Sequence, residues 1–388
     1  MDILKEKKPD MAEYRKQIDE VDAELLKLFE QRMDIVKNIG EYKREHGLGV
    51  FDAKREQDKL ARAVENVPEE LKGQSVLLLR LLFELSRSYQ QNIMGLSGDL
   101  CQKIRGAIEG SEKLLPEFAP VACQGVEGTN SQYACRKLFK NPNIMYFSSF
   151  ESVFGAIEKG LCKYGIVPVE NSFAGTVNTV YDLMMNHRFY IVRSARMKIT
   201  HSLLAKPGTR LEDIKEVYSH PQALMQCSDF LNSLSGVRQI PYENTALAAK
   251  LVSESGRNDI AALSNPECAG YYGLECLKAA AENKDNNYTR FVCITRHLEI
   301  LPGANRTSLM VTLPHEQGSL YKLLSRFYAL GINLLKLESR PIPEREFEFM
   351  FYFDLDVSVY APEFLKLIAE LPSACESFTY LGSYSEVV

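Results

Sequence analysis

The sequence has no tryptophan, no CxxC pair and no long hydrophobic run. Its nine cysteines are scattered singly, which is typical of reduced thiols in a cytosolic protein and argues against a disulfide framework or a cysteine zinc site. The six histidines lack HExxH or a similar ligand spacing, so we expect no metal. The most apolar stretch, residues 76–85, is interrupted by Arg80 and is far shorter than the roughly 20 residues that a bilayer requires.

Composition and charge are those of an ordinary globular protein. The chain has 388 residues, of which 45% are hydrophobic and 25% charged, with a formal net charge of -5. At about 150 residues per domain, this length suggests two or three domains. The sequence lacks a basic patch, so nucleic acid is not an expected partner. The first 22 residues carry charges of both signs and no apolar signal-peptide core, so we expect a cytoplasmic protein that does not associate with membranes.

The first hundred residues have the hydrophobic spacing of a helical bundle. Apolar residues recur in steps of three and four, which predicts three helices over residues 11–42, 52–66 and 68–94. Asp52 is the candidate N-cap of the second helix. We therefore expect an all-helical domain over residues 1–100, whose long first helix packs against partner helices.

Three cations lie on the apolar stripe of the first predicted helix. Arg15 and Arg32 fall within the seam, and Lys43 points to the same side. A guanidinium in an apolar seam costs several kcal/mol unless an anion neutralises it. The cations could pair with acidic side chains of the bundle or extend to water. Three on one stripe instead favour a pocket for a dianionic small molecule, which arginine binds bidentately.

Two further domains follow a linker rich in glycine and proline at residues 101–118. In residues 119–298, short β-like runs alternate with helical segments such as 221–234, which predicts a mainly parallel α/β sheet. We expect two lobes that divide near Ile199 and enclose a cleft, as in periplasmic binding proteins. Residues 306–388 have the order βαββαβ of an α+β, ferredoxin-like domain.

The helical domain resembles the all-helical chorismate mutases. The residues that carry the resemblance are Arg15, Arg32, Lys43, Asp52, Arg55 and Glu56. Ser86 and Gln90 lie one turn apart on the third helix, where that family has a hydroxyl and an amide; Ser88 and Gln91 are alternatives in a shifted register. The resemblance implies an intertwined dimer in which Arg15 reaches the partner's pocket, and an isomerase reaction that rearranges chorismate to prephenate.

The residue types suit this pericyclic reaction. It needs no nucleophile, metal or cofactor, only a compact substrate conformer and donors that stabilise charge on the ether oxygen. Lys43 and Gln90 are the expected donors. Asp52 and Glu56 would hold a substrate hydroxyl or the neighbouring cations. They could instead be only a helix cap and an acid that interacts with the helix dipole.

The central domain resembles prephenate dehydratase in four segments. These are QGVEG at 124–128 with Ser131, VPVENS at 167–172 with GTV at 175–177, SHPQ at 219–222 with QC at 226–227, and YTRF at 288–291. The glycine- and serine-rich turns among them open helices, whose free backbone N–H groups can bind a carboxylate. The resemblance implies a lyase that converts prephenate to phenylpyruvate.

The family's proton donor to the leaving hydroxyl corresponds to Thr289, which must be oriented and polarised by its neighbours. We expect His220, at a helix start, to be a structural hydrogen-bonding residue. The residues expected to bind prephenate are Glu170, Asn171, Ser172, Thr176, Ser219, Gln222, Gln226, Glu243, Thr289, Arg290 and Phe291.

The C-terminal domain resembles an ACT regulatory domain, and the resemblance implies phenylalanine as its effector. The residues expected to bind it are Gly318, Ser319, Leu320, Asn333, Glu338, Ser339, Arg340 and Pro341. Ser319 departs from the alanine that is usual at that position, which adds one hydroxyl group.

Together, the three resemblances have the order found in the bifunctional chorismate mutase/prephenate dehydratases of L-phenylalanine biosynthesis. They imply feedback inhibition by phenylalanine and at least a dimer. A fusion to prephenate dehydrogenase is disfavoured because no GxGxxG follows a predicted strand. A catalytically silent amino-acid sensor is the remaining alternative, and the intact set of Arg15, Arg32, Lys43, Glu56 and Thr289 argues against it.

Overall fold

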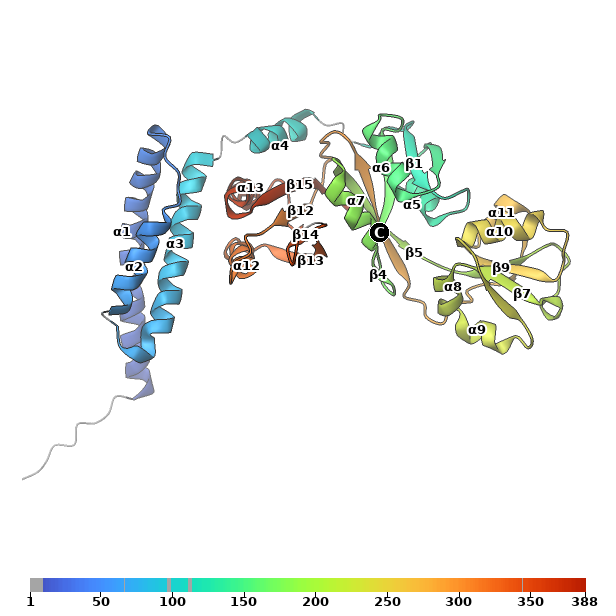
Figure 1. Cartoon of the computed structure of the whole chain (residues 1–388), viewed down its shortest axis with the longest axis horizontal. Helices are drawn as coiled ribbons and strands as arrows, with labels where there is room; N and C mark the ends of the chain where they lie inside the picture. The colour runs from blue at the N-terminus through green and yellow to red at the C-terminus, as the bar shows by residue number, and fades with distance from the viewer. Residues whose placement is uncertain (1–9, 66, 96–98, 111–113, 344) are drawn as a thin grey trace, which may run out of the picture. The chain divides into compact units, whose positions relative to one another are not determined.

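The chain divides into two compact units in the computed structural model (Figure 1). One unit comprises residues 1–102 with 365–374, and the other comprises residues 103–364 with 375–388. The structure describes residues 10–65, 67–95, 99–110, 114–343 and 345–388. Residues 1–9 of the predicted helical domain and residues 111–113 of the predicted linker therefore lie outside the described part.

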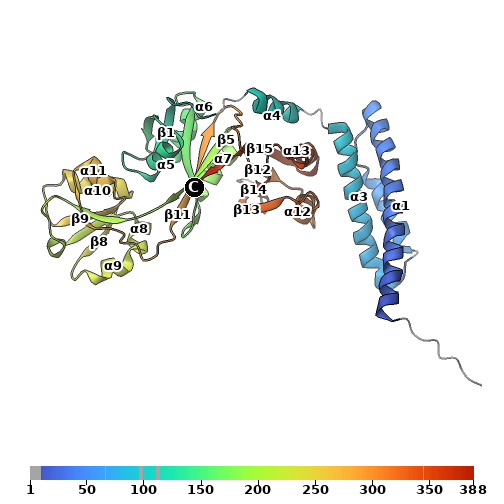
Figure 2. The same cartoon turned by 180° about the vertical axis from the view of Figure 1, so that it is seen from behind.

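The first unit contains the three predicted helices. They are α1 (Met11–Glu45), α2 (Ala53–Glu65) and α3 (Lys72–Gly95), with a 3-10 turn, η1 (Glu69–Leu71), before α3. The predicted N-cap of α2 is confirmed, because Asp52 Oδ1 accepts the backbone N–H of Arg55 at 3.0 Å. α1 and α3 lie side by side in both views (Figures 1 and 2).

The apolar seam predicted along α1 is largely exposed in the single chain. Ile18, Val21, Leu25, Leu28 and Ile35 are each more than half exposed. The residues of α1 that are buried are Val36 and Gly40. Contiguous apolar surface of this extent is rare on a monomer and marks an interaction surface.

Residues 101–110 of the predicted linker are helical and belong to α4 (Asp99–Gly110). Cys101 and Ile104 are buried at 2% and 0% exposure. Gly106 and Gly110 suggested irregular structure, yet each tolerates the helical conformation, and an added Cβ at either would have no neighbour within 4 Å. Burial of one face of the helix outweighs the low helix propensity of the two glycines.

The second unit begins with the first lobe of the α/β domain. Its elements are β1 (Pro120–Gln124), α5 (Asn130–Leu138), β2 (Asn143–Phe147), α6 (Phe150–Glu158), β3 (Tyr164–Asn171), β4 (Gly175–Thr176), α7 (Asn178–Asn186), β5 (Tyr190–Lys198) and, later in the chain, β11 (Tyr288–Thr295). The sheet order is β16-β5-β11-β3-β1-β2, with β4 paired to β3. Side chains of α5 pack against one face of this sheet, and those of α6 and α7 pack against the other.

The second lobe is inserted between β5 and β11. Its elements are β6 (Ser202–Ala205), η2 (Leu211–Asp213), β7 (Glu216–Ser219), α8 (Pro221–Gln226), α9 (Ser228–Ser233), β8 (Arg238–Pro241), α10 (Thr245–Glu254), β9 (Ile260–Ser264), α11 (Cys268–Tyr272) and β10 (Glu275–Lys278). The sheet order is β10-β6-β9-β7-β8. α10 and α11 lie on one side of the sheet, and α8 and α9 lie on the other (Figures 1 and 2). The predicted helix 221–234 is thus two short helices that meet at Cys227.

The predicted division near Ile199 is confirmed, but the sheets are mixed rather than mainly parallel. β1 pairs in parallel with β2 and β3, whereas β11 pairs antiparallel with both β3 and β5. β5 carries the chain out to the second lobe and β11 returns it, so the two connecting strands run in opposite directions. The alternation of strands and helices along the sequence does not reveal these antiparallel pairs, because β11 pairs with strands that lie about a hundred residues earlier in the chain.

The C-terminal domain has the predicted βαββαβ order. Its elements are β12 (Arg306–Thr312), α12 (Ser319–Ala329), β13 (Asn333–Pro341), β14 (Phe349–Asp356), α13 (Pro362–Ala374) and β15 (Ser377–Tyr384). The strands form an antiparallel sheet in the order β13-β14-β12-β15. The final strand, β16 (Glu386–Val387), pairs in parallel with β5, so the C-terminus lies at the first lobe (Figure 1).

The C-terminal sheet and the first lobe share one hydrophobic core. Met310, Met350 and Tyr352 of the sheet belong to the same buried cluster as Val292 and Ile294 of β11. The closest approach is at Gly382 of β15, where φ is +138° and an added Cβ would lie 2.3 Å from the carbonyl oxygen of Ile191. Only glycine fits there, because both the backbone conformation and the space exclude a side chain.

Candidate active sites

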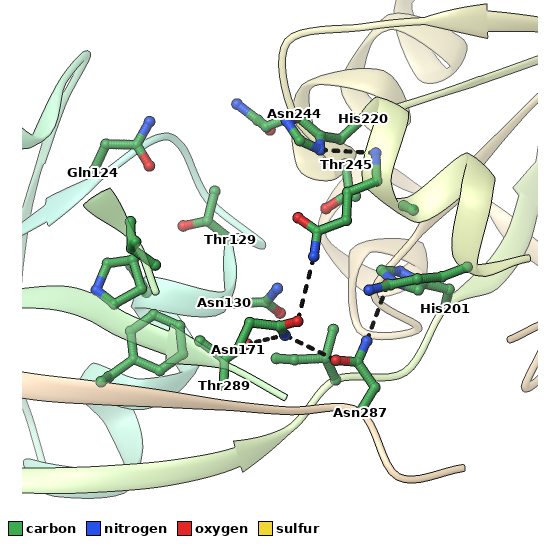
Figure 3. A pocket seen from close by; sticks show the side chains of 18 of the residues that line it. Gln124, Thr129, Asn130, Asn171, His201, His220, Asn244, Thr245, Asn287 and Thr289 are labelled. Atoms are coloured by element: carbon green, nitrogen blue, oxygen red, sulfur yellow. Dashed lines mark hydrogen bonds between the residues drawn. The ribbon is translucent and has the colours of Figure 1, made fainter. Parts of the chain in front are cut away.

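A pocket of about 240 Å³ lies in the cleft between the two lobes of the α/β domain. Polar residues of both lobes face it, and Figure 3 labels Gln124, Thr129, Asn130, Asn171, His201, His220, Asn244, Thr245, Asn287 and Thr289. The rest of the lining is Ser131, Phe150, Pro168, Val177, Ile199, Gln222, Ala223, Gln226 and Phe291. None of these described lining residues is an acid, a lysine or an arginine.

Helix N-termini supply the positive potential that the side chains of this pocket lack. α5 begins at Asn130 and α10 begins at Thr245, and both residues line the pocket. The first turn of a helix has backbone N–H groups without intrahelical partners and carries the positive end of the helix dipole. The pocket can therefore bind carboxylates through neutral donors and two helix N-termini.

The amide of Asn171 is held in one orientation beside Thr289. Its Oδ1 accepts the backbone N–H groups of Phe173 and Ala174 at 3.0 and 2.9 Å. Its Nδ2 therefore donates, to Thr289 Oγ1 at 2.9 Å and to Asn287 Oδ1 at 2.8 Å, as Figure 3 shows. Because the Thr289 hydroxyl accepts from Asn171, its own hydrogen remains available for a ligand.

Two histidines, His201 and His220, line the pocket. His220 is the N-cap of α8 and accepts the backbone N–H of Gln222 through Nδ1 at 3.3 Å, in keeping with the structural role expected for it. His201 is only 4% exposed. Burial lowers the pKa of both imidazoles below the ordinary value.

The structure brings part of the predicted prephenate site together. The predicted residues that line the pocket are Asn171, Gln222, Gln226, Thr289 and Phe291. Gln222 comes from the second lobe and donates through Nε2 to Asn171 Oδ1 of the first lobe at 3.3 Å. This bond spans the cleft.

Three of the predicted prephenate-binding residues lie outside the lining of the pocket. Ser219 is fully buried and donates to the carbonyl oxygen of Leu263 at 2.6 Å. Ser172 donates to the carbonyl oxygen of Asn286 at 2.9 Å, and Glu243 is exposed. None of the three lines the pocket.

Glu170, Thr176 and Arg290 contact the C-terminal domain instead of the cleft. Lys336 Nζ lies 3.0 Å from Glu170 Oε1. Thr176 donates to Glu338 Oε2 at 2.6 Å. The Arg290 guanidinium is buried and forms an ion pair with Asp354, which is 0% exposed. Alternation along β11 explains the last case, because Thr289 and Phe291 occupy the face opposite to Arg290.

Several pocket residues were missed by the sequence reasoning. They are Thr129, Asn130, His201, Asn244, Thr245 and Asn287. Asn244 was detectable, since asparagine before a helical segment is an N-cap signal, and its Oδ1 accepts the Leu247 N–H. His201 and Asn287 have no local signal. His201 lies on the outgoing connection after β5 and Asn287 on the returning connection before β11, so only the folded arrangement of the two connections brings them to one cleft.

The helical unit brings Arg32 and Ser86 together. Arg32 Nη1 donates to Ser86 Oγ at 2.5 Å. Ser86 and Gln90 are both 7% exposed, and among the described residues Gln90 Oε1 has no hydrogen-bonding partner although it is buried. Burial lowers the pKa of Arg32. Of the two registers considered for α3, the one with Ser86 therefore places its hydroxyl against Arg32.

Lys43, Asp52, Arg55 and Glu56 lie where α1 ends and α2 begins, whereas Arg15 lies near the start of α1. Lys43 Nζ donates to the carbonyl oxygen of Val50 at 2.7 Å. Burial lowers the pKa of Lys43, while the carboxylates of Asp52 and Glu56 act in the opposite direction. Glu56 also pairs with Arg87. Arg15 and Arg55 are exposed in the single chain.

The predicted effector residues fall into two groups. Ser319 and Leu320, which follow Gly318 at the start of α12, line a cavity of about 390 Å³ together with Phe347, Phe349 and Phe351. Glu338 and Arg340 face the first lobe, where Arg340 binds both carboxylate oxygens of Asp182 at 2.8 and 2.9 Å. Asn333, Ser339 and Pro341 are exposed.

Comparison with known proteins places both enzymatic domains in families. The family model described as Chorismate mutase type II matches residues 14–91, and the model described as Prephenate dehydratase matches residues 121–299. The bifunctional chorismate mutase/prephenate dehydratase of Escherichia coli K12 is 30% identical over 380 residues, which cover 95% of each chain. This chain belongs to the bifunctional chorismate mutase/prephenate dehydratase family. It is an enzyme of phenylalanine biosynthesis with both domains in the predicted order.

Other relatives are dehydratases that match about two thirds of this chain. Arogenate dehydratase/prephenate dehydratase 1 of Arabidopsis thaliana is 35% identical over 281 residues, which cover 68% of this chain and 71% of the relative. The solved prephenate dehydratase of Arthrobacter aurescens in complex with L-Phe has a TM-score of 0.64 and 27% identity, covering 69% of this chain and 89% of that one. Within the described residues, no helix meets the length and hydropathy of a membrane span, and no group of metal-ligating side chains is found.

The buried pair between β11 of the dehydratase and β14 of the C-terminal domain yields a stability prediction. Asp354→Asn leaves the Arg290 charge buried without its counter-ion, so we expect the free energy of unfolding to fall by about 3–5 kcal/mol. Adding Arg290→Met should recover part of the loss. Denaturant unfolding followed by circular dichroism measures this effect.

The matched control for that prediction is Asp356→Asn. Asp356 ends the same strand and is exposed, so the same substitution should change the stability by less than about 0.5 kcal/mol. Equal effects of the two substitutions would show that the buried ion pair does not hold the domains together.

Proposed function

We propose that Thr289 protonates the leaving hydroxyl of prephenate in the cleft of the dehydratase domain. The observation that carries this proposal is the hydrogen bond from Asn171 Nδ2 to Thr289 Oγ1, whose direction follows from two backbone N–H groups. A threonine hydroxyl is a weak acid, and a donor to its oxygen stabilises the negative charge that builds as the proton leaves. The hydroxyl hydrogen is thus polarised and directed away from Asn171.

The reaction then proceeds as one concerted elimination. The C–O bond of the ring hydroxyl breaks as that oxygen takes the Thr289 proton and leaves as water. The electrons of the bond to the ring carboxylate become a ring double bond, and the carboxylate leaves as carbon dioxide. Thr289 regains a proton from solvent before the next turnover. No general base is required.

The two carboxylates of prephenate have neutral donors in this cleft. The N-termini of α5 and α10 offer free N–H groups, and the amides of Gln222 and Gln226 line the pocket between them. Apolar side chains, including Phe150, Val177 and Phe291, offer a surface for the ring. This arrangement supports binding of a dianion without a buried arginine or lysine.

The test of this proposal uses chorismate as the sole substrate. The wild-type enzyme should convert chorismate to phenylpyruvate, whereas Thr289→Val should accumulate prephenate with a dehydratase kcat lowered about 10²–10⁴-fold. Thr289→Ser keeps a hydroxyl and should retain much more activity. Products are separated by chromatography. Phenylpyruvate formation by Thr289→Val at the wild-type rate would remove Thr289 from this role.

We propose further that the helical domain binds chorismate through Arg15, Arg32, Lys43, Asp52, Arg55, Glu56, Ser86 and Gln90. Contacts of Arg32 with Ser86 and the proximity of Lys43 to Asp52 and Glu56 support the part of this site contributed by one chain. Lys43 and Gln90 would donate to the ether oxygen.

A second copy of the chain is the proposed partner of the exposed face of α1. The exposed Ile18, Val21, Leu25, Leu28 and Ile35 have the spacing of a helix seam. Arg15 lies on the same stripe and is exposed. A two-fold dimer would cover the apolar residues and carry Arg15 to the pocket of the partner.

Mixing two inactive variants tests this shared site. Arg15→Gln and Arg32→Gln should each lose most mutase activity. If Arg15 acts in the partner's pocket, a mixed dimer has one site in which both arginines are intact. After unfolding and refolding a 1:1 mixture, about one quarter of the wild-type mutase activity should return. No recovery would mean that both arginines act in the same chain.

The C-terminal domain is proposed to be an ACT domain that binds L-phenylalanine and inhibits the dehydratase. The cavity at Ser319 and Leu320 is bordered by three phenylalanine side chains, which suit an aromatic ligand. Glu338 and Arg340 contact Thr176 and Asp182 of the dehydratase, so the predicted effector strand is physically connected to the catalytic lobe.

A filled cavity should remove inhibition without affecting catalysis. L-Phenylalanine should lower the wild-type dehydratase rate, and Ser319→Leu should raise the concentration needed for half-inhibition at least about tenfold. The control is Ala329→Leu, on the exposed end of the same helix, which should leave inhibition unchanged. Unaltered inhibition of Ser319→Leu would place the effector elsewhere.

We also propose a cytoplasmic location. All nine cysteines are free thiols, and all except Cys276 and Cys375 are buried. This use of cysteine as a small apolar side chain suits a reducing compartment.

A further inference from the structure

Two cleft residues outside every sequence motif, Asn287 and His201, both bond to the side-chain oxygen of Gln226. We propose that Asn287 and His201 are positioning residues that orient the Gln226 amide so that its NH₂ group faces the substrate carboxylates. This inference rests on the proposed role of Gln226 in binding prephenate.

Backbone groups set the orientation of the Asn171 amide. The N–H groups of Phe173 and Ala174 can only donate, so the Asn171 atom that they contact is Oδ1. Asn171 Nδ2 then contacts the Tyr288 carbonyl oxygen at 3.3 Å, which can only accept. Three backbone groups therefore define the direction of the Asn171 amide without reference to any other side chain.

The orientation of the Asn171 amide determines the orientation of the Asn287 amide. Asn171 Nδ2 donates to Asn287 Oδ1 at 2.8 Å, so the other end of the Asn287 amide is the donor. That donor, Nδ2, lies 3.0 Å from Gln226 Oε1. Asn287 is 2% exposed, so water cannot easily replace either bond. Rotating its amide by 180° would set two donors against each other and two acceptors against each other, which is costly in a buried site.

The hydrogen bond from Asn287 to Gln226 Oε1 also determines the tautomer of His201. Its Nε2 lies 3.1 Å from the same Gln226 Oε1, which already accepts from Asn287 and has no hydrogen to give. Nε2 must therefore carry the hydrogen. Nδ1 is buried and has no hydrogen-bonding partner in the described part of the chain, as expected of a bare lone pair.

The charge state of His201 agrees with this geometry. Burial lowers the pKa of the ring, although the Gln226 contact and the Glu282 carboxylate act in the opposite direction. Glu282 Oε2 accepts the backbone N–H of His201 at 3.0 Å. Burial thus favours the neutral imidazole, and of the two neutral tautomers only the Nε2–H form donates to Gln226.

Two donors on Gln226 Oε1 leave the NH₂ group as the end of that amide available to a ligand. The described lining of the pocket contains no lysine or arginine, so binding of a dianion there depends on neutral hydrogen-bond donors. A glutamine free to rotate would present its oxygen to a carboxylate for part of the time. The chain from Asn171 to His201 prevents this, and it is built from side chains that need not touch the substrate.

The decisive variant is Asn287→Asp, which keeps the shape and the acceptor for Asn171 but replaces the donor with an oxygen. Above the pKa of the new carboxyl, Gln226 should rotate and turn its oxygen to the substrate. We expect the KM for prephenate to rise about 10- to 100-fold, with kcat changed much less. Burial at this 2% exposed position raises the pKa of the new carboxyl, and a protonated carboxyl can donate again, so the KM should fall back toward the wild-type value as the pH is lowered from 8 toward that pKa.

Asn286→Asp is the matched control, since Asn286 is the exposed neighbour in the same loop and the substitution adds the same charge. Its KM should equal that of the wild type at every pH. The mutase activity of each variant and its thermal unfolding midpoint report on folding. An Asn287→Asp enzyme that folds and shows a wild-type KM at pH 8 would overturn the proposal.

Ring ¹⁵N resonances test the tautomer directly, with His201→Asn used for assignment. In the wild type, His201 should be the neutral Nε2–H form and remain so below pH 6.5. In Asn287→Asp at pH 8, the rotated Gln226 would donate to His201, and the Nδ1–H form should appear. An Nδ1–H tautomer in the wild type would refute the chain of bonds.

These outcomes are separable from failure of the proposed function. If Gln226→Ala binds prephenate with an unchanged KM, Gln226 does not contact the substrate, and the inference falls with that part of the proposed function. If Gln226→Ala raises the KM while Asn287→Asp does not, only the positioning role is wrong. The Thr289 variants report on kcat and are independent of both results.

Discussion

Side chains alternate between the two faces of β11, and both functions of the second unit depend on that alternation. Thr289 and Phe291 face the cleft, while Arg290 between them faces the C-terminal sheet and pairs with Asp354. A shift of one residue in the pairing of β11 would exchange these faces. The buried ion pair opposes such a shift, because either charge left alone in the core would be strongly destabilising. One strand thus joins the proposed proton donor to the domain proposed to regulate it.

The two active sites treat anions in different ways. The residues proposed for the mutase site include several cations, of which Arg15 and Arg55 are exposed in the single chain. The described lining of the dehydratase pocket contains no acid, lysine or arginine, and the proposed donors there are helix N-termini and amides, among which the direction of Asn171 is set by backbone groups. Oriented neutral donors of this kind need no counter-ion when the pocket is empty and do not have to reorganise as charge moves during the reaction.

Side chains of the dehydratase domain contact the C-terminal domain directly, and these contacts can couple a ligand of the C-terminal domain to the dehydratase cleft. Glu170 and Thr176 flank the turn that holds Asn171, and they contact Lys336 and Glu338 of β13. Arg290 follows Thr289 and contacts β14. A ligand that moved either strand would therefore act within one residue of the atoms proposed to transfer the proton. Such coupling requires only that the ligand bind two arrangements of these strands with different affinity.

The sequence by itself determined the helices, most strands, the order of three domains and the segments that contain the cleft, because hydrophobic period, caps and motifs are local properties. It correctly placed Thr289, Asn171 and Gln226 at one pocket. Only the tertiary structure decided that Arg290 faces away from that pocket, that the sheets are mixed, and that Asn287 and His201 complete the site. The first two depend on β11 returning between the lobes to pair with distant strands, and the last depends on both connections between the lobes, the outgoing one with His201 and the returning one with Asn287. No local pattern encodes which face of a central strand meets which neighbour.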